Sequence, residues 1–160
     1  MNKRLELSKA DFFPDLFADE ALSVSRLTTT SWRFAAFLWT NVDHGGEDRS
    51  SWAADQWRNQ LAVPGLEFYA VFSDQEPAGC CEILRAPRLM TAKGGVARFN
   101  SFGLLPEFVG EGLGSVLMTR MVEKAFATGA SKLTMSTARD LPPAMLRICR
   151  SQGFRILESV

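Results

Sequence analysis

The stretch LLPEFVGEGLGSVLM, residues Leu104–Met118, places three glycines within five positions. The residues before it, VARFNSFGLLP at 96–106, have the apolar content of a strand, and those after it have the spacing of an amphipathic helix over 113–128, with Gly129 as its C-cap. The first N–H groups of a helix have no partner within the helix, and glycine leaves room for a phosphate to approach them. The stretch therefore predicts a pyrophosphate-binding loop between a strand and a helix.

Two common phosphate loops do not match this stretch. No lysine lies between Gly110 and Ser115, which excludes the pattern G-x-x-x-x-G-K-[ST], and the spacing G-x-G-x-G differs from the dinucleotide pattern G-x-G-x-x-G. A purely structural interpretation, in which the glycines serve a tight turn and close helix packing, stays open on the loop alone.

Periodicity predicts the remaining elements. In the first part of the chain we expect a strand at Arg4–Lys9, a helix from Ala10 to about Leu27 with Phe13, Phe17, Ala21 and Val24 on one face, and helices over 31–42 and 51–61. In the second part we expect a hairpin of strands 66–73 and 78–86, a strand at 132–138, a helix at 142–152 and a last strand at 154–160. This order indicates an α/β chain of the α+β type, with residues 1–160 as one domain and helices packed over a mixed sheet.

Composition excludes several classes of protein. The chain of 160 residues carries 18 basic and 18 acidic side chains, so it has no general attraction to nucleic acid or to an anionic membrane. The N-terminus lacks the apolar segment of a signal peptide, and we expect a cytoplasmic protein. Three cysteines and one histidine lack metal-ligand spacing, and the adjacent pair Cys80 and Cys81 indicates packing of one side chain on each face of a strand.

The segment FGLLPEFVGEGLGSVLM, followed by a strand, a short helix and SQGF, resembles the acyl-coenzyme A (acyl-CoA) site of the GCN5-related N-acetyltransferase (GNAT) superfamily. That signature is Gln or Arg, two residues, Gly, one residue, then Gly or Ala. Gly110 and Gly112 match it, whereas Glu107 stands where Gln or Arg is usual. The resemblance covers about residues 67–160 and implies a mixed, mostly antiparallel central sheet flanked by helices.

The resemblance also implies which residues hold coenzyme A. Backbone groups of the loop would bind the pyrophosphate, namely those of Val109, Gly110, Glu111, Gly112, Leu113, Gly114 and Ser115. Leu104 and Leu105 would pair with the pantetheine arm as an added strand would, and the strand at 132–138 would diverge there to leave a slot for the thioester. Main-chain donors would polarise the acyl carbonyl, as in an oxyanion hole.

Two catalytic positions depart from the family pattern. Cys149 stands where a tyrosine commonly acts as general acid, so it is the candidate acid here, and packing of a small buried residue is the alternative. The strand before the loop carries Arg98, Asn100 and Ser101 where a carboxylate base is common, which makes Glu82 the nearest candidate base and His44 an alternative.

Trp39, Arg98 and Ser101 are the candidate acceptor-binding residues. Arg98 could hold a carboxylate of the acceptor or lie at the surface, and Trp39 could line the pocket or belong to the core.

The expected function is acyl-CoA-dependent N-acyl transfer without a metal. Acetyl-CoA is the simplest donor, and a small-molecule amine would attack its thioester directly in a ternary complex. Two alternatives stay open: different chemistry at a retained coenzyme A or pantetheine site, such as decarboxylation, hydrolysis or transfer from another carrier, and a non-catalytic acyl-CoA sensor. The family habit of pairing through the last strands also suggests a possible homodimer.

Overall fold

The computed structural model describes residues 3–17, 19–85, 90–91, 94–137 and 141–158. Its strands are β1 (Lys3–Ser8), β2 (Leu22–Leu27), β3 (Leu66–Ser73), β4 (Glu76–Leu84), β5 (Met90–Thr91), β6 (Gly94–Leu104), β7 (Lys132–Thr137) and β8 (Arg155–Glu158). Its α-helices are α1 (Trp32–Asn41), α2 (Ala54–Leu61), α3 (Leu113–Phe126) and α4 (Pro143–Ser151), and short 3-10 turns lie at Lys9–Asp11, Thr29–Ser31 and Pro106–Phe108.

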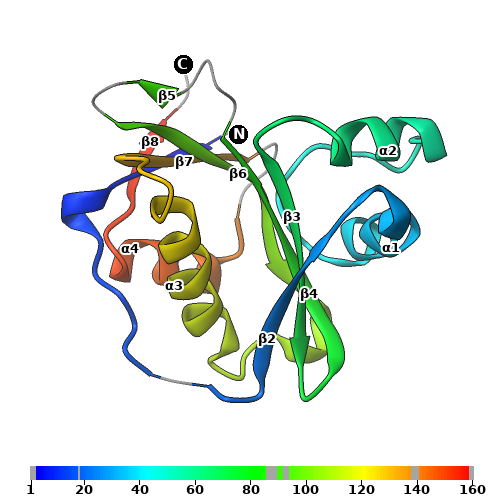
Figure 1. Ribbon diagram of the computed structural model, residues 1–160. Helices are drawn as coiled ribbons and strands as arrows, with labels where there is room; N and C mark the ends of the chain where they lie inside the picture. Colours follow the sequence, from blue (N-terminus) through cyan, green and yellow to red (C-terminus); the bar gives the residue numbers. More distant parts are fainter. Residues whose placement is uncertain (1–2, 18, 86–89, 92–93, 138–140, 159–160) are drawn as a thin grey trace.

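The strands form one mixed sheet in the order β2-β3-β4-β6-β7-β1-β8, with β5 paired to β6. Among the described pairs only β6 and β7 run parallel; every other pair is antiparallel. The N-terminal strand β1 lies between β7 and β8, so the first residues of the chain complete the sheet beside its last strands (Figure 1). The predicted fold class is therefore confirmed.

Helices cover both faces of this sheet, with α1 and α2 on one face and α3 and α4 on the other (Figure 1). Cys80 packs with Trp57 and Phe68 beneath α1 and α2, whereas Cys81 packs with Phe99 and other residues beneath α3 and α4. The adjacent cysteines thus point to opposite faces of β4, as the sequence predicts, because successive side chains alternate along a strand.

The hairpin of β3 and β4 is confirmed with a shorter turn than expected. Asp74 and Gln75 form its two-residue turn, both with positive φ (49° and 70°), and β4 already begins at Glu76. Two left-handed residues fit the right-handed twist of the strands on either side.

The predicted helix over 10–27 is wrong. Its last residues form β2, which pairs along β3, and the residues before it are held in place by individual hydrogen bonds from Phe13 N–H to the Gln152 carbonyl and from Asp15 N–H to Thr119 Oγ1. The supposed apolar face is not buried, since the side chains of Phe13 and Phe17 are 74% and 71% exposed. Pairing with β3 outweighed a local spacing that only resembled a helix.

The other predicted elements are confirmed within a few residues at their ends. The ends of three predicted strands, at Ala86, Ala138 and 159–160, lie outside the described residues. None of the helices that the structure describes is long and apolar enough to cross a membrane.

A bulge in β6 and the end of its pairing with β7 lie close together and interrupt the regular sheet. The register between β4 and β6 shifts between the pairs Glu82–Ser101 and Ile83–Phe99, which leaves Asn100 as an extra, bulged residue. Close by, the parallel pairing of β6 with β7 ends at Phe99, although β6 continues to Leu104. The diverging strands open the sheet at this point, as the resemblance implies.

Candidate functional site

The glycine loop lies between the 3-10 turn after β6 and the first residue of α3. Gly110 and Gly112 have φ values of +91° and +80°, a conformation that side chains disfavour, and nothing lies within 4 Å of where a Cβ would stand on either. Gly112 caps α3 without a side-chain hydrogen bond, so the first N–H groups of the helix have no capping side chain. Gly114 has a packing role, because a Cβ there would lie 3.1 Å from the Ile148 side chain on α4.

A pocket of about 740 Å³, here called the glycine pocket, opens beside this loop. Six of the predicted coenzyme-binding residues line it: Leu104, Val109, Gly110, Gly112, Gly114 and Ser115. The opposite wall comes from α4, mainly Met145, Arg147 and Ile148. Leu105, Glu111 and Leu113 are not among its lining residues; Leu105 and Leu113 are buried in the core, and Glu111 is exposed.

The end of β6 also has backbone groups that face the slot. Leu105 N–H donates to the Ala78 carbonyl on β4, 2.7 Å away. Because N–H groups alternate between the two sides of a strand, Leu104 directs its own N–H away from β4 and toward the slot beside β7. The direction of this N–H group fits the expected pairing of Leu104 with a pantetheine arm, whereas Leu105 directs its N–H to β4.

A second pocket, here called the arginine pocket, has a volume of about 510 Å³. It lies on the α1 and α2 side of the sheet and is lined by Gly46, Glu47, Arg49, Gln60, Val63, Leu66, Leu84, Arg98, Phe99, Asn100, Ser136 and Thr137. Its polar groups come from β6, from β7, from α2 and from the loop 42–53 between α1 and α2.

The α1–α2 loop (residues 42–53) lies between the two pockets. Asp43 lines the glycine pocket and Gly46 lines the arginine pocket. The loop packs closely against β6, since a Cβ on Gly103 would lie 2.6 Å from the Val42 side chain and a Cβ on Gly46 would lie 2.5 Å from the Asn100 carbonyl. The loop therefore borders both pockets.

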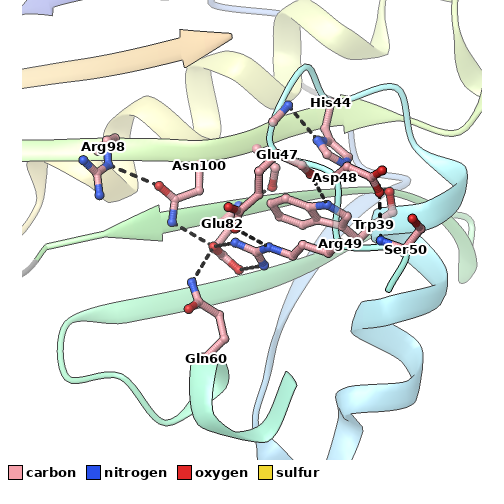
Figure 2. Close-up of polar contacts among 12 residues, drawn as sticks. Trp39, His44, Glu47, Asp48, Arg49, Ser50, Gln60, Glu82, Arg98 and Asn100 are labelled. Carbon is pink, nitrogen blue, oxygen red and sulfur yellow. Dashed lines mark hydrogen bonds and ion pairs between the residues drawn. The ribbon is translucent and has the colours of Figure 1, made fainter. Parts of the chain in front are cut away.

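A buried ion pair holds the same loop to the sheet (Figure 2). The Arg49 guanidinium donates two hydrogen bonds to the Glu82 carboxylate, at 2.9 and 2.8 Å, and the two side chains are only 2% and 0% exposed. The guanidinium carbon lies 3.6 Å from the centroid of the Trp39 ring and 4.3 Å from that of Trp52. Charge pairing and aromatic stacking together compensate the burial of Arg49.

The geometry gives Glu82 a structural role rather than that of a base. Its Oε1 also accepts hydrogen bonds from Asn100 Nδ2 at 2.8 Å and Gln60 Nε2 at 3.2 Å, in addition to the Arg49 contacts. These four hydrogen bonds, two of them from a guanidinium, fix the carboxylate inside the protein, and Glu82 is not among the residues that line either pocket.

Cys149 belongs to α4 and to the core on the α3 and α4 side of the sheet. Its side chain is fully buried, and it is not among the residues that line the glycine pocket. Burial raises the pKa of its thiol to about 12. The structure therefore offers this thiol no path to a leaving group, and its geometry is that of a packing residue.

The three expected acceptor-binding residues have different positions. Arg98 lines the arginine pocket. Ser101 is buried and its hydroxyl accepts a hydrogen bond from Glu82 N–H, so it supports the bulge instead of facing a pocket. Trp39 is buried, donates its indole N–H to the Glu47 carbonyl, and reaches only a smaller hollow on the outer side of the α1–α2 loop.

His44 is part of the same loop and is buried. Its Nδ1 accepts a hydrogen bond from Gly46 N–H at 2.8 Å, which leaves Nε2 to donate to the Trp39 carbonyl at 3.0 Å. Both ring nitrogens hold the loop conformation, and this geometry favours a structural role over that of a base.

Gln152 connects the glycine loop to α4, and the sequence analysis assigned it no role of its own. Its buried side-chain amide donates to the carbonyl of Ser115 at 2.9 Å, and its Oε1 accepts a hydrogen bond from Thr119. The next residue, Gly153, has a positive φ and lies against the Asp11 carbonyl, where a side chain would collide. The segment SQGF thus fixes the start of α3 against the end of α4.

Sequence reasoning missed most of the arginine pocket. Arg49, Gln60 and Asn100 belong to three distant segments, and none lies in a recognisable motif. One signal was present, because three tryptophans flank the polar loop that contains Arg49, and aromatic rings often surround a buried guanidinium. Among the described residues, no group of His, Cys, Asp and Glu could hold a metal ion.

Comparison with known families gives one match that covers most of the chain. The sequence model of the acetyltransferase (GNAT) family matches residues 27–154. A search of curated protein sequences gave no significant match.

Solved structures share the fold at low sequence identity. A GCN5-related N-acetyltransferase from Kribbella flavida has a TM-score of 0.63 and 15% identity over 95% of the present chain and 52% of its own, so the present chain spans about half its length. An aminoglycoside acetyltransferase from an uncultured soil metagenomic sample, in complex with sisomicin, has a TM-score of 0.64 and 12% identity over 84% and 88% of the two chains. The aminoglycoside N-acetyltransferase AAC(6')-Iy in complex with CoA has a TM-score of 0.61 and 14% identity over 91% and 95%. At these identities the similarity shows the fold alone.

Proposed function

Because the chain belongs to the acetyltransferase (GNAT) family, we propose that it transfers an acyl group, most simply acetyl from acetyl-CoA, to the amine of a small molecule. The amine nitrogen attacks the thioester carbonyl carbon directly, the carbon–sulfur bond breaks, and the proton lost from nitrogen balances the charge of the departing thiolate. The glycine pocket is the donor site in this proposal, and the arginine pocket is the acceptor site.

The observation that carries the proposal is the coincidence of three features at one place. The strands β6 and β7 diverge, two left-handed glycines leave open space, and α3 begins without a capping side chain. Together they provide an extended slot that ends at unpaired N–H groups, which suits a pantetheine arm attached to a pyrophosphate. The backbone from Val109 to Ser115 would hold that pyrophosphate.

Positioning supplies most of the catalysis in this proposal. Since Glu82 is paired with Arg49 and Cys149 is buried, the amine would arrive already deprotonated and react because it is aligned against a polarised thioester. Alignment alone can contribute about 7–11 kcal/mol to lowering a barrier. Residues 1–160 would act as one domain, in which β1 contributes the buried Leu5 and Leu7 to the core beneath α3 and α4.

A second candidate function is acyl-CoA binding without transfer. The positions of the two candidate catalytic residues motivate this function, because Glu82 is paired with Arg49 and Cys149 is buried in the core. Binding of coenzyme A without turnover of any amine would favour this sensor role. Loss of the thioester without an acceptor would favour hydrolysis or other chemistry at the same site.

The first experiment is calorimetric titration of the purified protein with acetyl-CoA, free coenzyme A and dephospho-coenzyme A. Micromolar binding of acetyl-CoA supports the donor site and justifies the search for an acceptor. If none of the three compounds binds, the glycines serve the fold alone and the acyltransferase proposal is overturned.

A further inference from the structure

We propose that the amine acceptor also carries a carboxylate, which Arg98 binds in the arginine pocket. This inference rests on the proposed acyl transfer and narrows its acceptor to a chemical class, the small amino-carboxylates, such as amino acids and short peptides.

Arg98 is held in place by one hydrogen bond and keeps its terminal nitrogens for another partner. Its Nε donates to Asn100 Oδ1 at 3.2 Å, and Figure 2 shows the two side chains next to each other on β6. No hydrogen bond or ion pair connects its Nη1 or Nη2 to the residues that the structure describes. A guanidinium fixed through Nε presents a planar fork that matches a carboxylate bidentately.

The nearby carboxylates do not neutralise Arg98. Both oxygens of Glu82 are engaged by Arg49, and Oε1 of Glu47 accepts from Arg49 Nε at 2.8 Å. Asn100 fixes the relative positions of these charges, since it accepts from Arg98 and donates to Glu82. Arg49 is thus paired with two carboxylates of the protein, and Arg98 is the cation among the described lining residues whose terminal nitrogens a ligand can pair with.

The position of Arg98 also orients such a ligand. Arg98 lies before the bulge at Asn100, and the pocket extends from it to Gly46 and Glu47 on the α1–α2 loop, which borders the glycine pocket. A carboxylate bound at Arg98 directs the amine of the same molecule toward that loop, where the thioester is expected. The exposed carboxylate of Glu47 suits an amine at that end.

The same distribution of charge disfavours polycationic acceptors. An aminoglycoside would bring several ammonium groups next to Arg98, whereas Glu47 is the one carboxylate among the described lining residues and already pairs with Arg49. Like charges placed together in an interface cost several kcal/mol. The acceptor class inferred here therefore differs from that of the aminoglycoside acetyltransferases with the same fold.

The test compares matched ligands on matched variants. Binding of an α-amino acid, a longer ω-amino acid and their carboxamides is measured by calorimetry on the protein saturated with coenzyme A, followed by their acetylation rates. We expect the wild-type protein to prefer each carboxylate over its carboxamide by about tenfold to a hundredfold, the range for a hydrogen-bonded charge. Arg98→Met should abolish this preference, and Arg98→Lys should restore part of it.

The control is Arg4→Met, which removes a half-exposed arginine from β1, outside both pockets. It should leave the preference unchanged, and thermal unfolding checks that each variant is folded. Equal binding of carboxylates and carboxamides by the wild-type protein overturns the inference, and so does an equal loss for both in Arg98→Met. If acetyl-CoA binds and an amine without a carboxylate is the better acceptor, only this inference fails; if acetyl-CoA does not bind, the proposed function fails as well.

Discussion

The glycine pocket and the arginine pocket are built from different kinds of groups. The first is formed mainly by the glycine loop and the end of β6, with α4 opposite it and Asp43 from the α1–α2 loop at its border. The polar side chains of the second come from β6, β7, α2 and the α1–α2 loop, and the buried pair of Arg49 and Glu82 connects this loop to the sheet. A backbone site needs few particular residues, whereas a side-chain site depends on every partner in its network.

This difference predicts that each pocket can be disrupted without the other. The arginine pocket should be the more fragile of the two, because removing one member leaves a buried charge. The glycine pocket should tolerate most changes except those that fill its open space.

The largest effect is expected from Glu82→Gln. It leaves the Arg49 guanidinium buried without a compensating charge, which should lower the free energy of unfolding by about 3–5 kcal/mol. Chemical denaturation measures this change, and acetyl-CoA affinity of the folded protein should be unaltered. Glu47→Gln is the matched control, because Glu47 pairs with the same arginine but is 61% exposed and should cost less than about 1 kcal/mol. Equal costs for the two variants would contradict the role given to the buried pair.

The next largest effect is expected from Gly112→Asp, which should disrupt the glycine pocket and leave the arginine pocket intact. A carboxylate in the space beside the start of α3 should repel a pyrophosphate and weaken acetyl-CoA binding by about a hundredfold, or about 3 kcal/mol. Gly129→Asp is the control, since Gly129 has the same left-handed conformation (φ +95°) and the same open surroundings at the other end of α3. Calorimetry on both variants should show loss of binding only for Gly112→Asp. Similar affinities would remove the phosphate-loop argument.

A smaller effect should follow when a side chain that supports the glycine pocket is removed. Gln152→Met removes the hydrogen bonds to Ser115 and Thr119, which should cost about 1–3 kcal/mol of stability and weaken acetyl-CoA binding about threefold to tenfold. Thr119→Val removes the more distant end of this network and the hydrogen bond from Asp15 N–H, but it leaves the contact between Gln152 and Ser115, so it should lower stability without changing affinity. An affinity loss of the same size in both variants would show that Gln152 does not position the loop.

The smallest effect is expected from Cys149→Ala. General acid catalysis contributes about a hundredfold or more, but the buried thiol should change turnover by less than about twofold. Burial raises the pKa of Cys149 and Cys80 to about 12, so both thiols stay protonated below that pH and should not react with thiol reagents in the native protein at pH 8. Reagent titration with and without denaturant checks this, and a tenfold loss of turnover would restore Cys149 as the acid.

The sequence predicted those parts of the fold whose signals are local. The start of α3 and the strands of the hairpin follow from residue type and spacing within about fifteen positions. The predicted C-cap at Gly129 is wrong, because α3 ends at Phe126 and its C-cap is Ala127. The segment before β2 shows where this reasoning fails. Its apolar residues have helical spacing, yet Leu22–Leu27 gains more from pairing with β3, a strand about forty residues away in the chain.

The same division holds for the catalytic candidates. Cys149 is the candidate acid because it stands where the family commonly has a tyrosine, and Glu82 is the candidate base because it is the nearest carboxylate. Whether such a group reaches a substrate depends on its neighbours, and those neighbours, Arg49 for Glu82 and the core beneath α3 for Cys149, come from other parts of the chain.

The position of the glycine loop could be predicted from the sequence, because a backbone site requires only glycines at the right spacing between a strand and a helix. Contacts seen only in the folded chain show that Arg49 neutralises Glu82 and that the terminal nitrogens of Arg98 have no partner among the described residues. The physical reason is that charge pairing and burial depend on distances between segments, which a linear pattern of residues does not specify.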